Sequence, residues 1–326
     1  MSIDAIYITL DYELFFGSSS GTVEKCLLEP TKKLIDIGKK YGVRFTFFVD
    51  TGMLCAMRRF STTYPELGQQ YQSISDQIQL LKSEGHSLQL HIHPHWEDSI
   101  YSQGRWVFDV RRYRLDHFGD ADIERIIFEY KNILDSIVGD GVRAFRAGGW
   151  CIQPFSRIGQ ELKRNGITID STIYRDGVMS TITHKFDFRR MPLQSQWRFE
   201  DDPLIPVVGG SFTEIPISVS IYSRWFYFKM FISRFFKIKK YRHFGDGSPV
   251  GVGRSSIIKK MLFGDLGVVS LDGFRSCNLN SYFSETSFLA NGVPIVVIGH
   301  PKALCSHSIA TLEKIALSYS NKFAVL

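Results

Sequence analysis

LQLHIHPHW, residues 88–96, places three histidines at the end of one apolar strand. Apolar residues at 88, 90 and 92 alternate with Gln89, His91 and His93, which is the pattern of a strand with one apolar face. Pro94 lacks a backbone donor and interrupts that pattern. The segment therefore predicts a strand that turns into a bent loop at its carboxyl end, where α/β folds hold their chemistry.

His91, His93 and His95 together favour a metal site. A single histidine is more often a surface or capping residue, but three within five residues favour a ligand role, because imidazole is the commonest metal ligand. Fully extended, residues 91 and 95 would lie roughly 13 Å apart, so the chain must curl for both to bind one ion. His86 opens the strand and is expected to be structural.

A carboxylate partner is offered by AIYITLDYELFFG, residues 5–17. The segment predicts a buried strand over residues 5–10 that ends in Asp11 and Glu13. Two acids at the end of a buried strand are costly unless they are paired, bound to metal or catalytic. Asp11 could instead cap the turn that follows.

Six motifs occur in the order TLDYEL (9–14), TFFVDTG (46–52), HIHPH (91–95), FRAGGW (145–150), GITIDST (166–172) and VVIGHP (296–301). This order resembles the polysaccharide deacetylases, the NodB-like carbohydrate esterases, over nearly the whole chain. The resemblance implies an α/β fold, a distorted (β/α) barrel of that type. It also implies that His91 and His95 are metal ligands, that His300 is the general acid and that Arg146 positions the catalytic base.

Two motifs depart from the family pattern. Tyr12 stands where the family has a second Asp, so Asp11 aligns with the base and the metal carboxylate is displaced, most plausibly to Glu13. FRAGGW keeps Arg146 but lacks the Pro and Tyr of the family motif, with Trp150 displaced along the loop. These departures indicate an atypical branch with an altered substrate.

The resemblance implies a hydrolytic mechanism at a divalent metal, with Zn²⁺ expected and Co²⁺ or Ni²⁺ as alternatives. Such an ion activates water and polarises an amide carbonyl. Asp11 would take the proton of the water, and His300 would protonate the leaving amine. Asp170 could orient His300, although a turn or cap role is more common for an Asp at a strand end. His93 and Trp150 are candidate substrate contacts.

Length and composition are those of one globular domain. The chain has 326 residues with 44% hydrophobic content, and we expect one domain over 1–326 with an insertion at about 221–250. The first strand begins too early for a signal peptide, and no run reaches the ~18 apolar residues of a membrane span. Five scattered cysteines suit a reducing compartment, so a cytoplasmic protein is expected.

Strands and helices alternate along the sequence, which predicts a parallel sheet covered by helices. Helices are expected over 30–41, 74–85, 121–138 and 155–166, and strands over 44–49, 142–146, 167–170, 267–271 and 294–299.

The segment RWFYFKMFISRFFKIKKYRHF, residues 224–244, breaks this alternation. It carries seven Lys or Arg and no acid, whereas the whole chain has 39 basic and 33 acidic residues, a difference of +6. Without the segment the balance is −1, so the basic character is local and does not indicate nucleic-acid binding. Trp225, Phe228, Ile232 and Phe235 share a helical face, which fits either a helix on a membrane interface or a packed lid.

Three functions fit these observations. The first is a metal-dependent N-deacetylase of an N-acetylated amino sugar, nucleotide- or lipid-linked, in a cytoplasmic pathway for a surface polysaccharide such as O-antigen or capsule. The second is a carbohydrate-binding protein on the same fold that has lost catalysis, which the altered motifs would explain. The third is a hydrolase of another amide.

Overall fold

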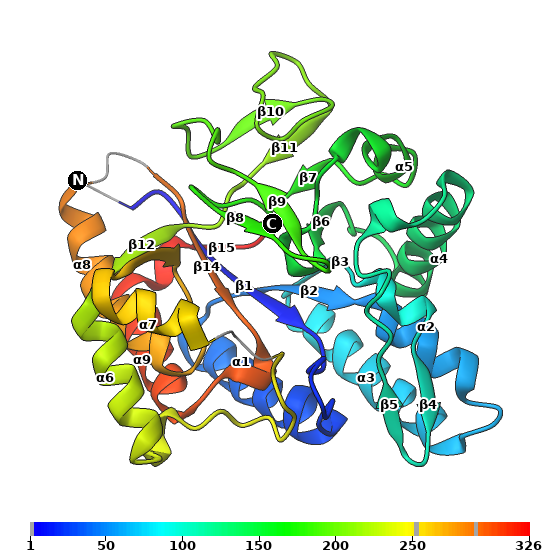
Figure 1. The fold of residues 1–326 in the computed structure, drawn as a ribbon, viewed down its shortest axis with the longest axis horizontal. Helices are drawn as coiled ribbons and strands as arrows, with labels where there is room; N and C mark the ends of the chain where they lie inside the picture. Colours follow the sequence, from blue (N-terminus) through cyan, green and yellow to red (C-terminus); the bar gives the residue numbers. More distant parts are fainter. Residues whose placement is uncertain (1–2, 251–253, 290–292) are drawn as a thin grey trace. The chain divides into compact units, whose positions relative to one another are not determined.

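The computed structural model describes residues 3–250, 254–289 and 293–326. The chain divides into two compact units, one made of Met1–Phe45 with Ser218–Val325 and the other of Thr46–Ile217 with Leu326. Each unit combines parallel strands with helices, as Figure 1 shows, so the predicted α/β class is confirmed. Among the described residues, no helix is long and apolar enough to cross a membrane.

The first unit is built on β1 (Ile6–Tyr12), whose side chains are almost entirely buried. β1 runs parallel to β14 (Ile295–Gly299), with Ile6 opposite Ile295 and Leu10 opposite Gly299, and parallel to β15 (Phe323–Ala324). β12 and β13 form an antiparallel pair. The remaining elements of this unit are α1 (Glu29–Tyr41), β12 (Val219–Tyr222), α6 (Arg224–Phe235), α7 (Arg254–Phe263), β13 (Asp265–Val268), α8 (Leu279–Leu289) and α9 (Ser306–Tyr319).

The helix predicted over 30–41 is confirmed as α1. Pro30 lies in its first turn, where the missing backbone donor costs nothing. Gly42 ends the helix in the left-handed conformation, with φ of 68°, which glycine adopts without strain. Leu34, Ile35 and Ile37 form its buried face.

The second unit contains the parallel strands β2, β3, β6, β7 and β11, paired in the order β2–β3–β6–β7–β11, with β10 antiparallel to β11. Helices α2, α3 and α4 pack on one another, and α3 and α4 also pack on β3. Its elements are β2 (Thr46–Asp50), α2 (Thr51–Phe60), α3 (Pro65–Ser83), β3 (Ser87–Ile92), β4 (Ile100–Ser102), β5 (Arg105–Val107), α4 (Asp120–Val138), β6 (Ala144–Ala147), α5 (Gly159–Arg164), β7 (Ile169–Asp170), β8 (Val178–Ser180), β9 (Lys185–Asp187), β10 (Trp197–Phe199) and β11 (Phe212–Glu214).

Several predicted boundaries were wrong. α3 begins at Pro65, nine residues before the predicted start, because Pro65 is a good first helical residue and the polar stretch that follows carries little periodic signal. α2 was missed, since it follows β2 without an intervening turn. The antiparallel pairs β4–β5, β8–β9 and β10–β11 were also missed, because strands of three residues carry almost no pattern.

Candidate functional site

The first unit brings Asp11, Glu13 and His300 to one edge of its sheet. Asp11 lies near the end of β1, Glu13 follows β1, and His300 follows β14. Because β1 and β14 are parallel neighbours with Leu10 opposite Gly299, these three residues leave the sheet at the same carboxyl end. His300 Nε2 lies 3.7 Å from Asp11 Oδ2 and 3.7 Å from Glu13 Oε1, and both acids are buried. This unit therefore presents an acid–base cluster.

Asp272 orients His300. His300 Nδ1 lies 2.8 Å from Asp272 Oδ2, and the backbone N–H of His300 donates to Asp272 Oδ1 at 2.8 Å. A parallel bridge between Ser270 and Ile298 brings Asp272 to this position. Burial opposes the charged imidazole, yet the carboxylates of Asp272, Asp11 and Glu13 outweigh it and raise the pKa of His300 to about 9. These carboxylates favour the protonated imidazole.

The sequence offered Asp170 as the residue that orients His300, and this was wrong, because Asp272 is the carboxylate bonded to Nδ1. Asp170 instead accepts from the backbone N–H of Thr172 at 3.0 Å and from its hydroxyl at 2.7 Å. This is the turn role that is more common for an Asp at a strand end. The signal that could have identified Asp272 was its place after the predicted strand 267–271.

Lys302 is a second residue that sequence reasoning missed. Its ammonium Nζ lies 2.8 Å from Glu13 Oε1 and donates to the Leu14 carbonyl at 2.6 Å, and the side chain is buried. A buried carboxylate needs such a partner, since an uncompensated charge in the interior is costly. The lysine therefore neutralises part of the negative charge that Asp11, Glu13 and Asp272 place around His300.

In the second unit, β3 delivers His91 to the carboxyl end of the parallel strands. Asp50 of β2 and Arg146 of β6 stand opposite His91 in the strand register, so the ends of three strands meet there. His91 Nδ1 lies 2.8 Å from the Arg146 carbonyl. A carbonyl only accepts, so Nδ1 carries the proton and Nε2 carries the lone pair. That arrangement is typical of a metal-binding histidine, whose second nitrogen is fixed by a hydrogen bond.

His93 and His95 continue from β3 into the buried loop. The His91 and His93 ring centroids lie 4.8 Å apart, and those of His93 and His95 lie 5.4 Å apart. His95 stacks on Tyr113 at 5.3 Å. A Cβ at Gly148 would lie 2.5 Å from His93 Nδ1, so the approach of the two segments requires glycine there.

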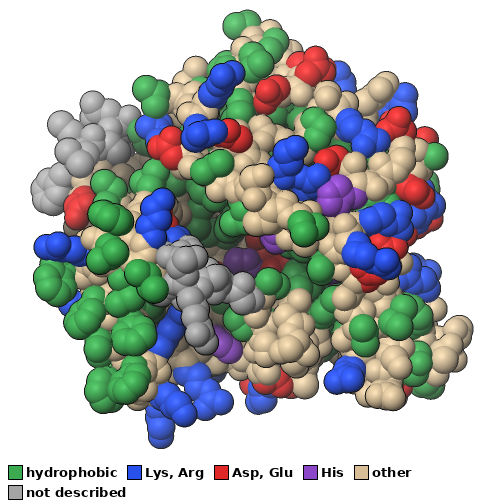
Figure 2. Space-filling model, in the orientation of Figure 1, with side chains coloured by type: hydrophobic (Ala, Val, Ile, Leu, Met, Phe, Trp, Pro, Cys, Tyr) green, Lys and Arg blue, Asp and Glu red, His purple; other side chains and the backbone are tan. Residues whose placement is uncertain are grey.

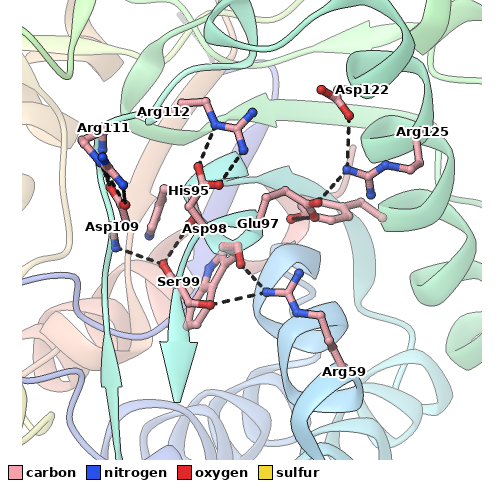
Figure 3. Close-up of polar contacts among 12 residues, drawn as sticks. Arg59, His95, Glu97, Asp98, Ser99, Asp109, Arg111, Arg112, Asp122 and Arg125 are labelled. Atoms are coloured by element: carbon pink, nitrogen blue, oxygen red, sulfur yellow. Dashed lines mark hydrogen bonds and ion pairs between the residues drawn. The ribbon is translucent and has the colours of Figure 1, made fainter. Parts of the chain in front are cut away.

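Charged side chains hold the loop that follows His95, as Figure 3 shows. Ser99 donates its hydroxyl to the His95 carbonyl at 2.7 Å, and Arg59 donates to the Trp96 carbonyl at 2.7 Å. Glu97 pairs with Arg125 at 2.7 Å, and Asp98 pairs with Arg112. Each residue from 95 to 99 is thus tied by its backbone or its side chain, which fixes the conformation of the histidine loop.

Arg146 is completely buried on β6. Its Nε donates to the Ser171 carbonyl at 2.7 Å, its Nη2 donates to the Ser171 hydroxyl at 3.1 Å, and the guanidinium lies 4.2 Å from the Phe48 ring centroid. These contacts fix its direction, as a residue that positions a base requires. That role for Arg146 stays a prediction.

Asp170 and Glu214 form a buried acid pair in the second unit. They stand opposite each other where β7 and β11 run parallel, and both are fully buried. Burial raises the pKa of Asp170, and burial together with the Asp170 charge raises that of Glu214 well above its usual range. Two such carboxyls cannot both be charged in the interior, so Glu214 holds a proton beside the Asp170 carboxylate.

We expect Glu214→Gln to flatten the pH dependence of stability. The pKa of Glu214 is higher in the folded protein than in the unfolded chain, where it is near 4.5. The contribution of Glu214 to the free energy of unfolding is therefore fully present below pH 4.5 and is lost as the pH rises toward the folded pKa. Glutamine keeps a donor beside Asp170 but does not titrate. Thermal melting between about pH 5 and pH 8 should therefore show a steeper fall in Tm for the wild type than for the variant.

The matched control is Glu200→Gln, the same chemical change at a half-exposed acid of this unit. Hydrogen bonds from Ser211 lower the pKa of Glu200 to about 2. It should leave the slope unchanged in that pH range. Equal slopes for wild type and Glu214→Gln would show that Glu214 is ionised in the folded protein.

Trp150 occupies a strained backbone position directly after the Arg146 strand. Its φ is 60°, in the left-handed region that a tryptophan rarely adopts, and its ring lies 5.2 Å from that of Tyr174. Strain of this kind is found where a side chain is held in place for function. A partly exposed aromatic ring suits stacking on a sugar, so its substrate-binding role stays a prediction.

Each unit contains donor atoms that suit a divalent metal. In the second unit the buried His91 and His93 offer ligand atoms within 4.8 Å of each other, and in the first unit Asp11 and Glu13 are buried carboxylates. The close pair of imidazoles contains His93, where the sequence predicted His95. A carboxylate with two imidazoles is a common ligand set for catalytic zinc and related metals.

Comparisons with known proteins give matches among solved structures only. No family model and no curated protein matches the sequence. A Mycobacterium smegmatis protein provisionally described as a polysaccharide deacetylase is 15% identical, with 91% of this chain and 73% of that chain covered and a TM-score of 0.43. A polysaccharide deacetylase from Bacillus cereus is 10% identical, with 98% and 89% covered and a TM-score of 0.41.

A family 4 carbohydrate esterase from Streptomyces lividans, in complex with acetate, is 10% identical, with 99% and 93% covered and a TM-score of 0.37.

Proposed function

We propose that this chain is a metal-dependent hydrolase that removes the N-acetyl group of an amino sugar. The observation that carries the proposal is His300, bonded to Asp272 through Nδ1 and lying 3.7 Å from each of Asp11 and Glu13 through Nε2. A histidine oriented by one carboxylate and set beside two others has the parts needed to move protons during amide hydrolysis. His91, fixed by the Arg146 carbonyl, adds a metal ligand to this chemistry.

Glu13, His91 and either His93 or His95 would hold the ion, and Zn²⁺ is the metal we expect, with Co²⁺ or Ni²⁺ as alternatives. The ion supplies an acidified water and a polarised acetyl carbonyl. Asp11 accepts the proton of the attacking water. His300 gives its Nε2 proton to the leaving amine, and Asp272 holds the imidazole in position throughout. Trp150 and the remaining histidine bind the sugar.

The substrate that we propose is an N-acetylated amino sugar, nucleotide- or lipid-linked, in the synthesis of a surface polysaccharide such as O-antigen or capsule. We place the protein in the cytoplasm. The five cysteines support this, because their odd number and scattered positions along the sequence suit a reducing compartment.

The test is acetate release by purified protein loaded with Zn²⁺, Co²⁺ or Ni²⁺, on free, nucleotide-linked and lipid-linked N-acetyl sugars. We expect release that requires the metal and that Asp272→Asn lowers by roughly 10²–10⁴-fold, because the amide no longer favours the imidazolium. Metal content should not change. Asp36→Asn makes the same substitution at an exposed position on α1 and should keep full activity.

Stoichiometric metal with glycan binding but no acetate would contradict the proposal and favour the carbohydrate-binding protein. Acetate or ammonia release from a small linear or cyclic amide, with none from sugars, would favour the hydrolase of another amide.

A further inference from the structure

Helix α6 in the first unit has two apolar faces, and one of them is exposed. Tyr227 is buried and Phe226 packs on Tyr222 and Phe274, with ring centroids 4.7 and 5.3 Å apart. On the outer side, the exposed fractions are 60% for Trp225, 45% for Phe228, 47% for Phe231, 69% for Phe235 and 67% for Phe236. At 3.6 residues per turn, the first four of these fall within about 120° of the helix circumference. The inner face accounts for the packing of α6, and the outer face has no such role.

The outer aromatic side chains form a continuous patch. Ring centroids lie 6.1 Å apart for Trp225 and Phe228, 6.4 Å for Phe231 and Phe235, and 5.2 Å for Phe235 and Phe236. α7 packs on α6 and adds further exposed apolar side chains. We call this the aromatic surface; it comprises Trp225, Phe228, Phe231, Phe235, Phe236, Ile258, Leu262 and Phe263. Figure 2 shows hydrophobic side chains gathered over α6 at its lower left. Contiguous patches of this kind are typical of interaction sites.

The charges on α6 and in the segment that follows it are all basic, and Asp265, after α7, is paired with Lys260. Lys229, Lys237, Lys239, Lys240 and Arg242 are exposed, and the sequence has no Asp or Glu between Glu214 and Asp246. Figure 2 shows Lys and Arg side chains beside the hydrophobic ones at this corner of the molecule. The partner therefore has to offer both an apolar layer and negative charge.

We propose that the aromatic surface binds the face of an anionic lipid bilayer, with its rings at headgroup depth and the lysines and arginine on lipid phosphates. Trp and Phe with Lys and Arg are the composition of helices that lie in a membrane interface. The 12 residues of α6 extend for about 18 Å, shorter than the ~30 Å hydrocarbon core, so the helix lies along the surface. A second copy of this chain is a poorer partner, because a two-fold interface here would oppose the same basic clusters.

The experiment is sedimentation of the full-length protein with vesicles of phosphatidylcholine alone or mixed with phosphatidylglycerol, at about 50 and about 500 mM salt. Wild type should partition at least about 10-fold more strongly onto the anionic vesicles at low salt, and high salt should remove that preference. The basic side chains would then select anionic vesicles, and the aromatic side chains would insert into the bilayer. The observation does not depend on the proposed hydrolase activity.

Two variants separate the contributions. Lys237, Lys239, Lys240 and Arg242 changed together to Gln should weaken anionic-vesicle binding by about 10- to 100-fold. Trp225→Ser with Phe235→Ser should weaken it by about 10-fold or more while keeping the salt dependence. The control changes Lys32, Lys39, Lys314 and Lys322 of the same unit to Gln, which alters net charge equally and should change binding less than about 3-fold.

Three outcomes would overturn the proposal. The first is wild type that binds neither kind of vesicle. The second is equal weakening by the control variant, which would mean that net charge alone is responsible. The third is a dimer that the Trp225 and Phe235 double variant dissociates in the absence of lipid, which would assign the aromatic surface to a second copy of the chain.

Discussion

Asp11→Asn is expected to abolish acetate release while leaving bound metal unchanged, and Glu13→Gln is expected to lose the metal. Loss of a general base alone typically lowers turnover by ~10²–10⁴-fold, whereas loss of a carboxylate ligand removes the ion on which the reaction depends. Bound metal by elemental analysis and acetate release, measured on the same preparations, check both outcomes.

The geometry around His300 does not distinguish the base from the metal ligand, so both variants are needed. His300 Nε2 lies at the same distance from both carboxylates, and both are buried, so neither feature separates base from ligand. Lys302 Nζ lies 2.8 Å from Glu13 Oε1. A buried ammonium could serve as the counter-charge of Glu13, which would leave the metal to Asp11. Metal loss in Asp11→Asn with metal kept in Glu13→Gln would show that the two roles are exchanged.

His91→Ala is expected to weaken metal binding by more than about 100-fold. Loss of a residue that only hydrogen-bonds to a metal ligand costs up to about 100-fold, and loss of the ligand itself should cost more. His91 is the histidine that the sequence motif predicts as a ligand and whose Nδ1 is fixed by the Arg146 carbonyl at 2.8 Å. Elemental analysis after exhaustive dialysis checks it, and full occupancy would contradict the assignment.

His93→Ala and His95→Ala decide the second imidazole. The motif spacing predicts His95, whereas His93 offers a ligand atom within 4.8 Å of one of His91. Only the variant of the true ligand should lose metal to the same extent as His91→Ala. His86→Ala is the matched control, because His86 is also buried, directly before the same strand and beside Phe47 at 5.7 Å between ring centroids, and should keep the metal.

Residues at the ends of long apolar strands were predictable. Asp11 and His300 each follow a run rich in β-branched residues, and His91 follows the alternating Leu88 and Leu90, so their place at a strand end can be read from local pattern. The helical character of 224–235 was also predictable from its periodicity. Which of its two apolar faces is buried was not, since both have similar hydrophobicity and only packing distinguishes them.

Asp272 and Glu214 could not be assigned from the sequence. Asp272 reaches His300, 28 residues away along the chain, through the bridge between Ser270 and Ile298. Glu214 reaches Asp170, 44 residues away along the chain, only because β11 pairs with β7. Strand order determines such partners, and a single sequence carries no local signal for strand order.

The sequence by itself determined the α/β class, the strand ends that carry acids and histidines, and the local basic and aromatic character of 224–244, because each depends on residues close together along the chain. Only the tertiary structure decided that Asp272 orients His300, that Lys302 compensates Glu13, that Glu214 is buried opposite Asp170, and which face of α6 is exposed. These depend on parallel pairing and burial, which bring distant residues together and change the energy of their charges.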